Sequence, residues 1–557
     1  MRRRALPLLV LVACASSHGT GERLERAPAP FTSARAVLLD FELDGKLIAD
    51  TEDRGELRSL VEAQLLFTVG QLNGERSVGR LGQLELSEIE ARLIPPPAPD
   101  DDAGASGDAG DAGDAGDSED AGAPVAAPPP PPRYAVSYKA NLPVAWGGET
   151  SPSSYTFTLP ASMSQADQKI FATKYGSKCA DPTAGSTDVG HLFVAYRPKQ
   201  GGCTLAADDV VTFEAKVTES RENTRGKHPE YHRIWADGAL RIVAMFTREL
   251  EVGTGGDAGM QAYDDFLWRS ETYLGELQPD DSKRSEPPGY STTGATTATL
   301  AAVLPDRRTI RIDVALVNAS LGAEGSAFDA WYDGLTPAAD VVLFNGHAGL
   351  GANVRSLMRK GKFEAGQYLI WFANGCDTFA YVDRTLVDRR ARVNVDDPDG
   401  TKHMDTVSNV MAGYFTALEA TSLTLIRALV DVRDPSRPPK TYEQIFSEID
   451  PEQMVVVSGE EDNELQPLPP APPAPPALPA TPEGEAPPAT EAPGKEAPEA
   501  SPEAAGKAPA SKGGQRNRSS CDVGLAPADP DTGLAAFAIA LATLLRRRFT
   551  RRTTPAT

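Results

Sequence analysis

The stretch of sequence that decides the fold covers residues 340–383, DVVLFNGHAGLGANVRSLMRKGKFEAGQYLIWFANGCDTFAYVD. It contains two apolar runs, residues 341–344 and 368–373, and each run breaks at an Asn-Gly pair. His347 follows the first pair, and Cys376 follows the second. Short apolar runs bounded by such breaks are typical of buried strands. We therefore predict two buried strands, each ending beside a polar residue.

The segment between the runs, 353–363, is predicted to be helical because its apolar residues recur at helical spacing among Arg and Lys. Strand, helix and strand together predict a crossover that joins two parallel strands. In such a sheet, ligands and chemistry gather at the carboxyl ends of the strands, where His347 and Cys376 fall. An imidazole beside a thiol can take the thiol proton or lower its pKa, so the pattern indicates an activated thiol nucleophile.

These two blocks resemble the signature of the caspase-like cysteine peptidases, which include caspases, metacaspases, legumains, clostripain and gingipains. The resemblance covers residues 233–459 and implies a caspase-like α/β fold, with His347 as the catalytic histidine and Cys376 as the nucleophile. Two positions depart from the family pattern. Ala348 follows the histidine, and Gly375 precedes the cysteine where the family usually has Ala, Gln or a similar residue.

The same resemblance implies a peptidase mechanism with a peptide or protein as the substrate. Cys376 would attack the peptide carbonyl, and His347 would act first as base and then as acid toward the leaving amine. Backbone N–H groups of Cys376 and of the turn at Ala348 and Gly349 would hold the oxyanion, since small side chains allow close approach.

Three acidic residues are candidates for a third group that orients His347 or receives a basic substrate residue: Asp377, Asp383 and Glu460. The alternative for each is a strand-end or helix-capping role, which is common for such residues. The sequence does not choose among the three.

The rest of this region alternates strand and helix patterns, which predicts a mostly parallel sheet with helices on both faces. The expected elements are strands at 240–246, 309–317 and 454–457, and helices at 260–274, 327–335 and 405–430.

Residues 34–220 are expected to form a separate, mostly-β domain. Two hairpins are predicted, at Asp44-Gly45 and after the apolar run 65–72 at Asn73-Gly74. Residues 56–66 between them have helical spacing. Further strands are expected at 134–146, 155–159, 192–196 and 210–217.

An acidic tract rich in Gly, Asp and Ala, residues 95–132, interrupts this domain. Calcium binding is the alternative interpretation, but the tract lacks a spaced ligand set with a closing glutamate. We therefore expect a solvated, disordered insert.

The chain has five cysteines, and four of them have an expected structural or processing role. Cys179 and Cys203 are expected to form a disulfide in an exported protein. Cys14 is assigned to lipid and Cys521 to a C-terminal tail. Cys376 is then left over, which favours its use as a nucleophile.

The N-terminus, residues 1–13, has a basic start and a short apolar core, and it is followed by Cys14. It resembles a bacterial lipoprotein signal, which implies cleavage before Cys14, lipid attachment there, and a tether over 14–33. The alternative is an ordinary signal peptide with an incidental cysteine. Either way, export is expected.

The C-terminal part begins with a Pro/Ala/Glu-rich segment, 466–519, which is expected to be an extended spacer. Residues 520–557 combine Cys521, a short apolar segment and clustered arginines, and they resemble the MYXO-CTERM sorting tail of myxobacterial surface proteins. The resemblance implies cleavage near Cys521 and retention at the outer membrane or cell surface. The alternative is a weak membrane anchor with its positive charges held inside.

Composition excludes several partners. A net charge of −23 and an isoelectric point near 4.8 argue against nucleic acid. The sequence has no phosphate-binding loop and no dinucleotide fingerprint, so no cofactor is expected. His228 and His232 have a metal-like spacing but no obvious third ligand, so no metal is expected.

Together these patterns predict a lipid-anchored bacterial envelope protein with a mostly-β domain and a caspase-like α/β domain. The first functional hypothesis is a cysteine endopeptidase that uses His347 and Cys376. The alternative is a non-catalytic envelope lipoprotein whose caspase-like fold serves binding or adhesion.

Overall fold

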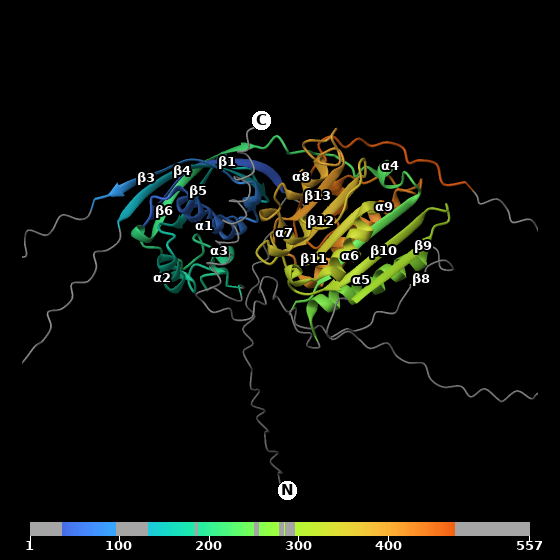
Figure 1. Ribbon diagram of the computed structural model, residues 1–557, viewed down its shortest axis with the longest axis horizontal. Helices are drawn as coiled ribbons and strands as arrows, with labels where there is room; N and C mark the ends of the chain where they lie inside the picture. The colour runs from blue at the N-terminus through green and yellow to red at the C-terminus, as the bar shows by residue number, and fades with distance from the viewer. Residues whose placement is uncertain are drawn as a thin grey trace, which may run out of the picture.

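A computed structural model describes residues 36–95, 132–249, 256–277, 283–284 and 296–473, apart from residues 183 and 185–187. The described strands form two separate sheets, each with its own helices (Figure 1). Strands of the first sheet come from residues 37–219, here called the β domain. Strands of the second come from residues 239–458, here called the α/β domain.

The β domain is built on an antiparallel sheet whose longest strands are β1 and β4. The order is β2-β4-β1-β6-β5, and β3 also pairs with β4. Its strands are β1 (Val37–Ala49), β2 (Val78–Gly79), β3 (Glu85–Ile94), β4 (Arg133–Trp146), β5 (Ser154–Pro160) and β6 (Val210–Glu219). Strand β1 pairs with β4 over its whole length, so it runs straight through Asp44 and Gly45. The hairpin predicted there is therefore wrong.

One face of this sheet is covered by helices, which the sequence only partly predicted. They are α1 (Arg54–Asn73), α2 (Gln165–Tyr175) and the short α3 (Leu192–Ala195). Residues 65–72 and 192–196 were predicted as strands, but 65–72 and 192–195 are helical, and only Tyr196 forms an isolated bridge. In 65–72 every residue except Leu66 is buried, because the helix packs against both the sheet and α3. A helix buried on several sides shows the same continuous apolar run as a buried strand.

A disulfide closes the end of the β domain that carries α2 and α3. It joins Cys179 and Cys203, whose Cα atoms lie 4.7 Å apart. Cys179 is fully buried in the hydrophobic core of this domain, so the bond also anchors the loop to that core.

The α/β domain contains a mixed sheet with a parallel centre. Its order is β14-β13-β12-β11-β7-β10-β9-β8. The parallel strands are β7 (Ala239–Thr247), β10 (Thr309–Val317), β11 (Val341–Gly346), β12 (Leu369–Gly375) and β13 (Met404–Asn409). The antiparallel edges are β14 (Val455–Ser458) on one side and β9 (Thr296–Val303) with β8 (Lys283–Arg284) on the other.

In chain order, the parallel strands are arranged 2-1-3-4-5, a common doubly-wound order. The order reverses between β7 and β11. In open sheets of this kind, a crevice forms outside the carboxyl ends of the strands at the reversal, and ligands bind there.

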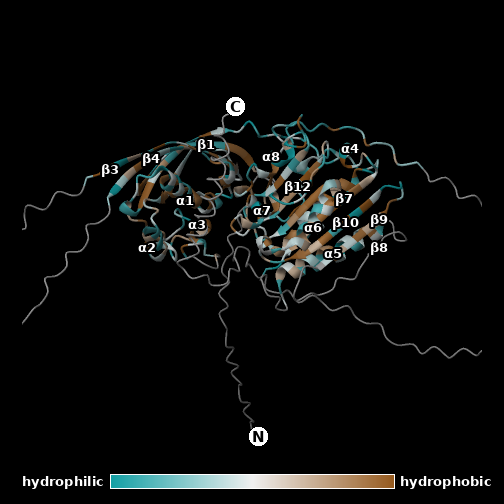
Figure 2. Cartoon of the chain, in the orientation of Figure 1, coloured by the Kyte–Doolittle hydropathy of each residue, from teal (hydrophilic) through white to brown (hydrophobic). Residues whose placement is uncertain are grey.

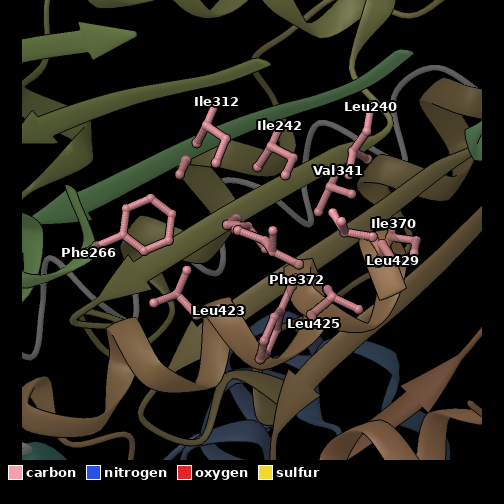
Figure 3. Packing of buried hydrophobic residues seen from close by; sticks show 14 of the residues in the cluster. Leu240, Ile242, Phe266, Ile312, Val341, Ile370, Phe372, Leu423, Leu425 and Leu429 are labelled. Atoms are coloured by element: carbon pink, nitrogen blue, oxygen red, sulfur yellow. The ribbon is translucent and has the colours of Figure 1, made fainter. Parts of the chain in front are cut away.

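Helices cover both faces of this sheet, as predicted. One face carries α5 (Ala258–Leu277), α9 (Phe415–Asp431) and α10 (Tyr442–Phe446), whose apolar residues pack on Ile242, Ile312 and Ile370 (Figure 3). The other face carries α6 (Ser326–Leu335), α7 (Ala352–Met358) and α8 (Thr385–Ala391). The short helix α4 (Tyr231–Ile234) precedes β7.

One long helix predicted at 405–430 is wrong in its first part. Residues 404–409 form strand β13, and the helix α9 begins only at Phe415. All six residues of β13 are buried although four are polar, Asp405, Thr406, Ser408 and Asn409. Polar side chains at buried positions conceal the strand pattern.

Hydropathy follows this architecture. Figure 2 shows the central strands of the α/β domain as apolar, and the outer helices as mixed in hydropathy. Among the helices within the described ranges, none has both the length and the apolar character needed to cross a membrane.

The two domains share a buried apolar cluster, here called the seam. It combines Leu38, Val69 and Val78 of the β domain with residues of β12, α7 and α8 and with the segment that follows Cys376. The β domain therefore packs against the same face of the mixed sheet as α7 and α8. The residues predicted to carry chemistry lie close to this contact.

Candidate active site

His347 and Cys376 follow strand ends that are paired in register. Gly346 of β11 lies opposite Gly375 of β12 in a parallel ladder. His347 directly follows Gly346, and Cys376 directly follows Gly375. Neighbouring strands lie about 4.8 Å apart, so the two loops start beside each other. They also start at the carboxyl edge next to the β7/β11 reversal, where a ligand crevice is expected.

His347 is held from several sides. Its N–H donates to Oγ1 of Thr247 at 3.1 Å, and its carbonyl accepts from Nδ2 of Asn353 at 2.9 Å. Its ring packs edge-on against Phe415, with the ring centroids 4.9 Å apart. The residue is only 6% exposed. The backbone of His347 is thus fixed by hydrogen bonds, and its ring is buried against Phe415.

The residues that hold His347 were not found from the sequence. Thr247 is the last residue of β7, and a Cβ on Gly346 would lie 1.9 Å from its Oγ1. Asn353, in the first turn of α7, also accepts from the N–H of Leu321 at 2.8 Å. The available signal for Thr247 was its position: it is a polar residue at the end of β7, the strand that pairs with β11.

Cys376 is partly exposed, and it lies outside the disulfide. Its Sγ is 3.6 Å from the carbonyl oxygen of Gly413 in the loop after β13. Gly413 packs closely as well, because a Cβ there would lie 3.1 Å from Gly375. Cys376 therefore has some solvent access, and it follows the strand that pairs with the His347 strand.

The predicted oxyanion turn is tightly wound. Gly349, Leu350 and Gly351 all have positive φ, at 58°, 49° and 85°. The carbonyl of Ala348 accepts from the N–H groups of Gly351 and Asn353, at 2.9 and 3.2 Å. The N–H groups of Gly351 and Asn353 are therefore engaged inside the turn itself.

Directly beneath the site lies a row of asparagines that the sequence analysis did not use. Asn345, Asn374 and Asn409 end or nearly end three neighbouring strands, and all are fully buried. Nδ2 of Asn374 donates to Oδ1 of Asn345 at 2.8 Å and to the Leu418 carbonyl at 2.9 Å. Nδ2 of Asn409 donates to Oδ1 of Asn374 at 3.3 Å. Asn345 and Asn374 each precede a glycine but Asn409 precedes Val410, so no shared sequence pattern marked this row.

Of the three acidic candidates, Asp377 lies next to the thiol but faces the β domain. It has a left-handed backbone, with φ 48° and ψ 32°, and is 6% exposed. Burial raises the pKa of its carboxyl to about 6, while the charge of Arg197 and the side chain of Asn73 oppose that rise. Both partners belong to the β domain, so Asp377 is directed to the seam.

Asp383 has a local structural role. Its Oδ1 accepts from the N–H of Thr385 at 2.7 Å, at the start of α8. The N-cap residue of α8 is Arg384, so Asp383 bonds the start of the helix from one position before the cap.

Glu460 lies at the end of the sheet opposite His347 and Cys376. Strand β14 is antiparallel to β13, and Ser458 lies opposite Thr406. Gly459 approaches Met404 so closely that a Cβ would lie 2.3 Å from the Met404 carbonyl. Glu460 is therefore near the amino end of β13, roughly 15 Å from its carboxyl end at about 3.3 Å per residue. This placement excludes Glu460 as a partner of His347.

Glu460 lines a small pocket of about 60 Å³ between the start of β1 and strand β14. It accepts a hydrogen bond from Thr224, and burial raises its pKa to about 8. Nearby Asp405 accepts from Tyr368, Tyr442 and Asn463, and burial raises its pKa to about 7. The pocket is separate from the dyad.

His228 precedes α4 and His232 lies within it, in the connector before β7. Both are partly buried, and burial lowers the pKa of each imidazole. Over the described ranges, no group of three or more His, Cys, Asp or Glu side chains is placed to hold a metal ion.

Several predicted features lie outside the described residues. These are the lipid-attachment site Cys14 with its signal and tether, nearly all of the acidic tract 95–132, most of the spacer 466–519, and the tail with Cys521.

No protein-family model matches this chain, and no curated protein matches it.

Proposed function

We propose that this protein is a cysteine peptidase of the caspase-like type, exported and held at the bacterial cell envelope. The observation that carries the proposal is the paired end of two parallel strands, Gly346 with Gly375, which are followed by His347 and Cys376. The doubly-wound strand order adds support, because this edge is where such sheets bind ligands.

In the proposed mechanism, His347 accepts the proton of Cys376, and the thiolate attacks the carbonyl carbon of a peptide bond. The developing oxyanion is held by N–H groups of Cys376 and of the Ala348–Gly349 turn. His347 then donates its proton to the leaving amine, which breaks the C–N bond and leaves an acyl-enzyme. Water attacks the thioester, and the thiol is regenerated.

The proposed location rests on the sequence features at the two ends, with Cys14 as the lipid-attachment site and Cys521 in the sorting tail. The Cys179–Cys203 disulfide supports export, because disulfides persist mainly in oxidising compartments. A lipid-anchored peptidase at the outer membrane or cell surface would act on exposed peptides or proteins.

The burial of His347 favours a second candidate function. At 6% exposure and packed against Phe415, the imidazole also fits a purely structural role. Under this alternative, the protein is a non-catalytic envelope lipoprotein that uses its fold for binding or adhesion. The partial exposure of Cys376 favours the peptidase.

The test is the alkylation rate of Cys376 by iodoacetamide in the full chain, from about pH 5 to about pH 9, read by mass spectrometry of the peptide that contains Cys376. An activated pair predicts fast labelling at low pH that falls about a hundredfold in His347→Ala. The control is His191→Ala, which removes a histidine of the β domain that pairs with Asp188. Slow labelling indifferent to His347 would reject the peptidase in favour of the binding protein.

A further inference from the structure

The segment that follows Cys376 is held by the β domain as well as by its own domain. Val69 and Val78 of the β domain share the seam with Phe379 and Val382. Leu350, in the turn after His347, packs against the hydrophobic core of the β domain. Both loops of the candidate site therefore contact the β domain.

Two close contacts fix the far end of this segment. The guanidinium of Arg80 lies 4.5 Å from the centroid of the Phe379 ring, at cation–π distance. Arg80 is only 3% exposed and also donates to Oγ of Ser458 at 2.9 Å. A Cβ on Gly82 would lie 2.6 Å from the carbonyl oxygen of Val382, so two backbones touch here.

Asp377 fixes the near end. Its N–H donates to the carbonyl of Met411 at 3.3 Å, which ties the Cys376–Asp377 peptide to the loop after β13. Its side chain is buried on the other side, toward Arg197 and Asn73 of the β domain. Asp377 is thus bonded to its own domain through its backbone, and its side chain is buried.

Arg197 is itself rigidly placed. Its guanidinium donates to the carbonyls of Gly70 and Val194, near the ends of α1 and α3, and forms an ion pair with Asp181 at 3.1 Å. These bonds fix it to the helical layer of the β domain. A shift of that layer would therefore move the charge that faces Asp377.

We propose that the β domain is the positioning element of the thiol site, and that Asp377 is a positioning residue which transmits the docking of Arg197 and Asn73 to the backbone of Cys376. This inference rests on the proposed function and adds its regulation. Anything that displaces the β domain at the seam releases the segment 377–382, rotates the Cys376–Asp377 peptide, and moves both Sγ and the N–H of Cys376 away from His347.

The test compares Asp377→Asn and Arg197→Gln in the full chain. Asparagine keeps the tolerance for a left-handed backbone and nearly the same size, while it removes the charge and one acceptor oxygen. Lys199→Gln is the matched control, because it removes a cation two residues away that pairs with Glu75 on the surface. Arg197→Lys keeps the charge and guards against a simple folding defect, which thermal melting would also reveal.

Two quantities are measured: the alkylation rate of Cys376, and the pH at which its thiolate forms. Asp377→Asn and Arg197→Gln should each lower the alkylation rate about tenfold and raise the pH at which the thiolate forms. The double variant should be no worse than either single variant, since both break one link. Arg197→Lys should recover most of the rate, and Lys199→Gln should match the wild type.

If Asp377→Asn and Arg197→Gln both keep the wild-type alkylation rate and the wild-type pH of thiolate formation, the positioning role is overturned, whatever the result for His347→Ala. An effect of Asp377→Asn and Arg197→Gln in a protein whose alkylation does not depend on His347 would show that the β domain positions Cys376 alone, and it would overturn the peptidase proposal. The two failures are thus distinguishable.

Discussion

Gly375 lies so close to Gly346 that a Cβ on Gly375 would be 2.3 Å from the Gly346 carbonyl oxygen. Real Cβ atoms do not approach backbone oxygens this closely, so glycine is required immediately before Cys376. The close approach also sets the gap between the strand ends that carry His347 and Cys376.

Gly375→Ala should lower thermal stability by about 2 kcal/mol or more, because the added methyl group meets rigid backbone. It should also slow the alkylation of Cys376. Gly334→Ala is the control: Gly334 is exposed in α6 with nothing within 4 Å of its Cβ position, and alanine there should be neutral or stabilising. Equal melting temperatures for Gly375→Ala and the wild type would show that the strand ends can separate.

Asn374→Ala should destabilise the protein by about 1 to 3 kcal/mol, because it removes the side-chain donor to the buried Leu418 carbonyl and one of two donors to Oδ1 of Asn345, which keeps its bond from Ser422. Asn374→Asp should cost more, since a carboxylate would face those two acceptors. Asn409→Ala removes a single longer bond, at 3.3 Å, and should cost less. Calorimetric melting gives the ranking, and a reversed order would refute the importance of this row.

Glu460 should make stability fall as pH rises. Its pKa is raised from 4.5 to about 8 in the folded protein, so the folded state binds an extra proton between these values. That contribution is complete below about pH 4.5 and is lost as pH rises through about 8.

Glu460→Gln imitates the protonated side chain, and at pH 8 it should be more stable than the wild type by on the order of 2 kcal/mol. The difference should shrink toward pH 5. Melting temperatures at both pH values test this, with Glu452→Gln, an exposed glutamate, as the control. A wild-type pH dependence in Glu460→Gln would contradict the raised pKa.

Loss of the Cys179–Cys203 disulfide should destabilise the β domain by about 3 kcal/mol, the loop-closure term for a sequence separation of 24. The variant Cys179→Ala with Cys203→Ala tests this by calorimetry, with the wild type under reducing conditions as a second measurement. If the β domain positions the thiol, melting of the β domain at a lower temperature should change the alkylation rate of Cys376 at that lower temperature too. Melting at the wild-type temperature would show that packing alone fixes this loop.

Prediction from sequence succeeded where the local pattern and the burial agreed. The expected strands at 240–246, 309–317 and 341–344 and the helix at 327–335 are present, because apolar runs bounded by Gly, Asn or Asp report burial directly. It failed at 65–72, a helix buried on several sides. It also failed at 405–409, where buried polar residues such as Asp405 are satisfied by distant partners.

The sequence by itself determined the alternation of strands and helices in the α/β domain, and the positions of His347 and Cys376 just after two buried strands. Such periodicities are local, because backbone geometry sets them within a few residues. Only the tertiary structure decided that Asp377 faces Arg197, that Glu460 lies at the opposite end of the sheet, and that three asparagines form a row beneath the site. Each of these depends on partners far apart in the chain, and a contact made by distant residues leaves no trace in the local pattern.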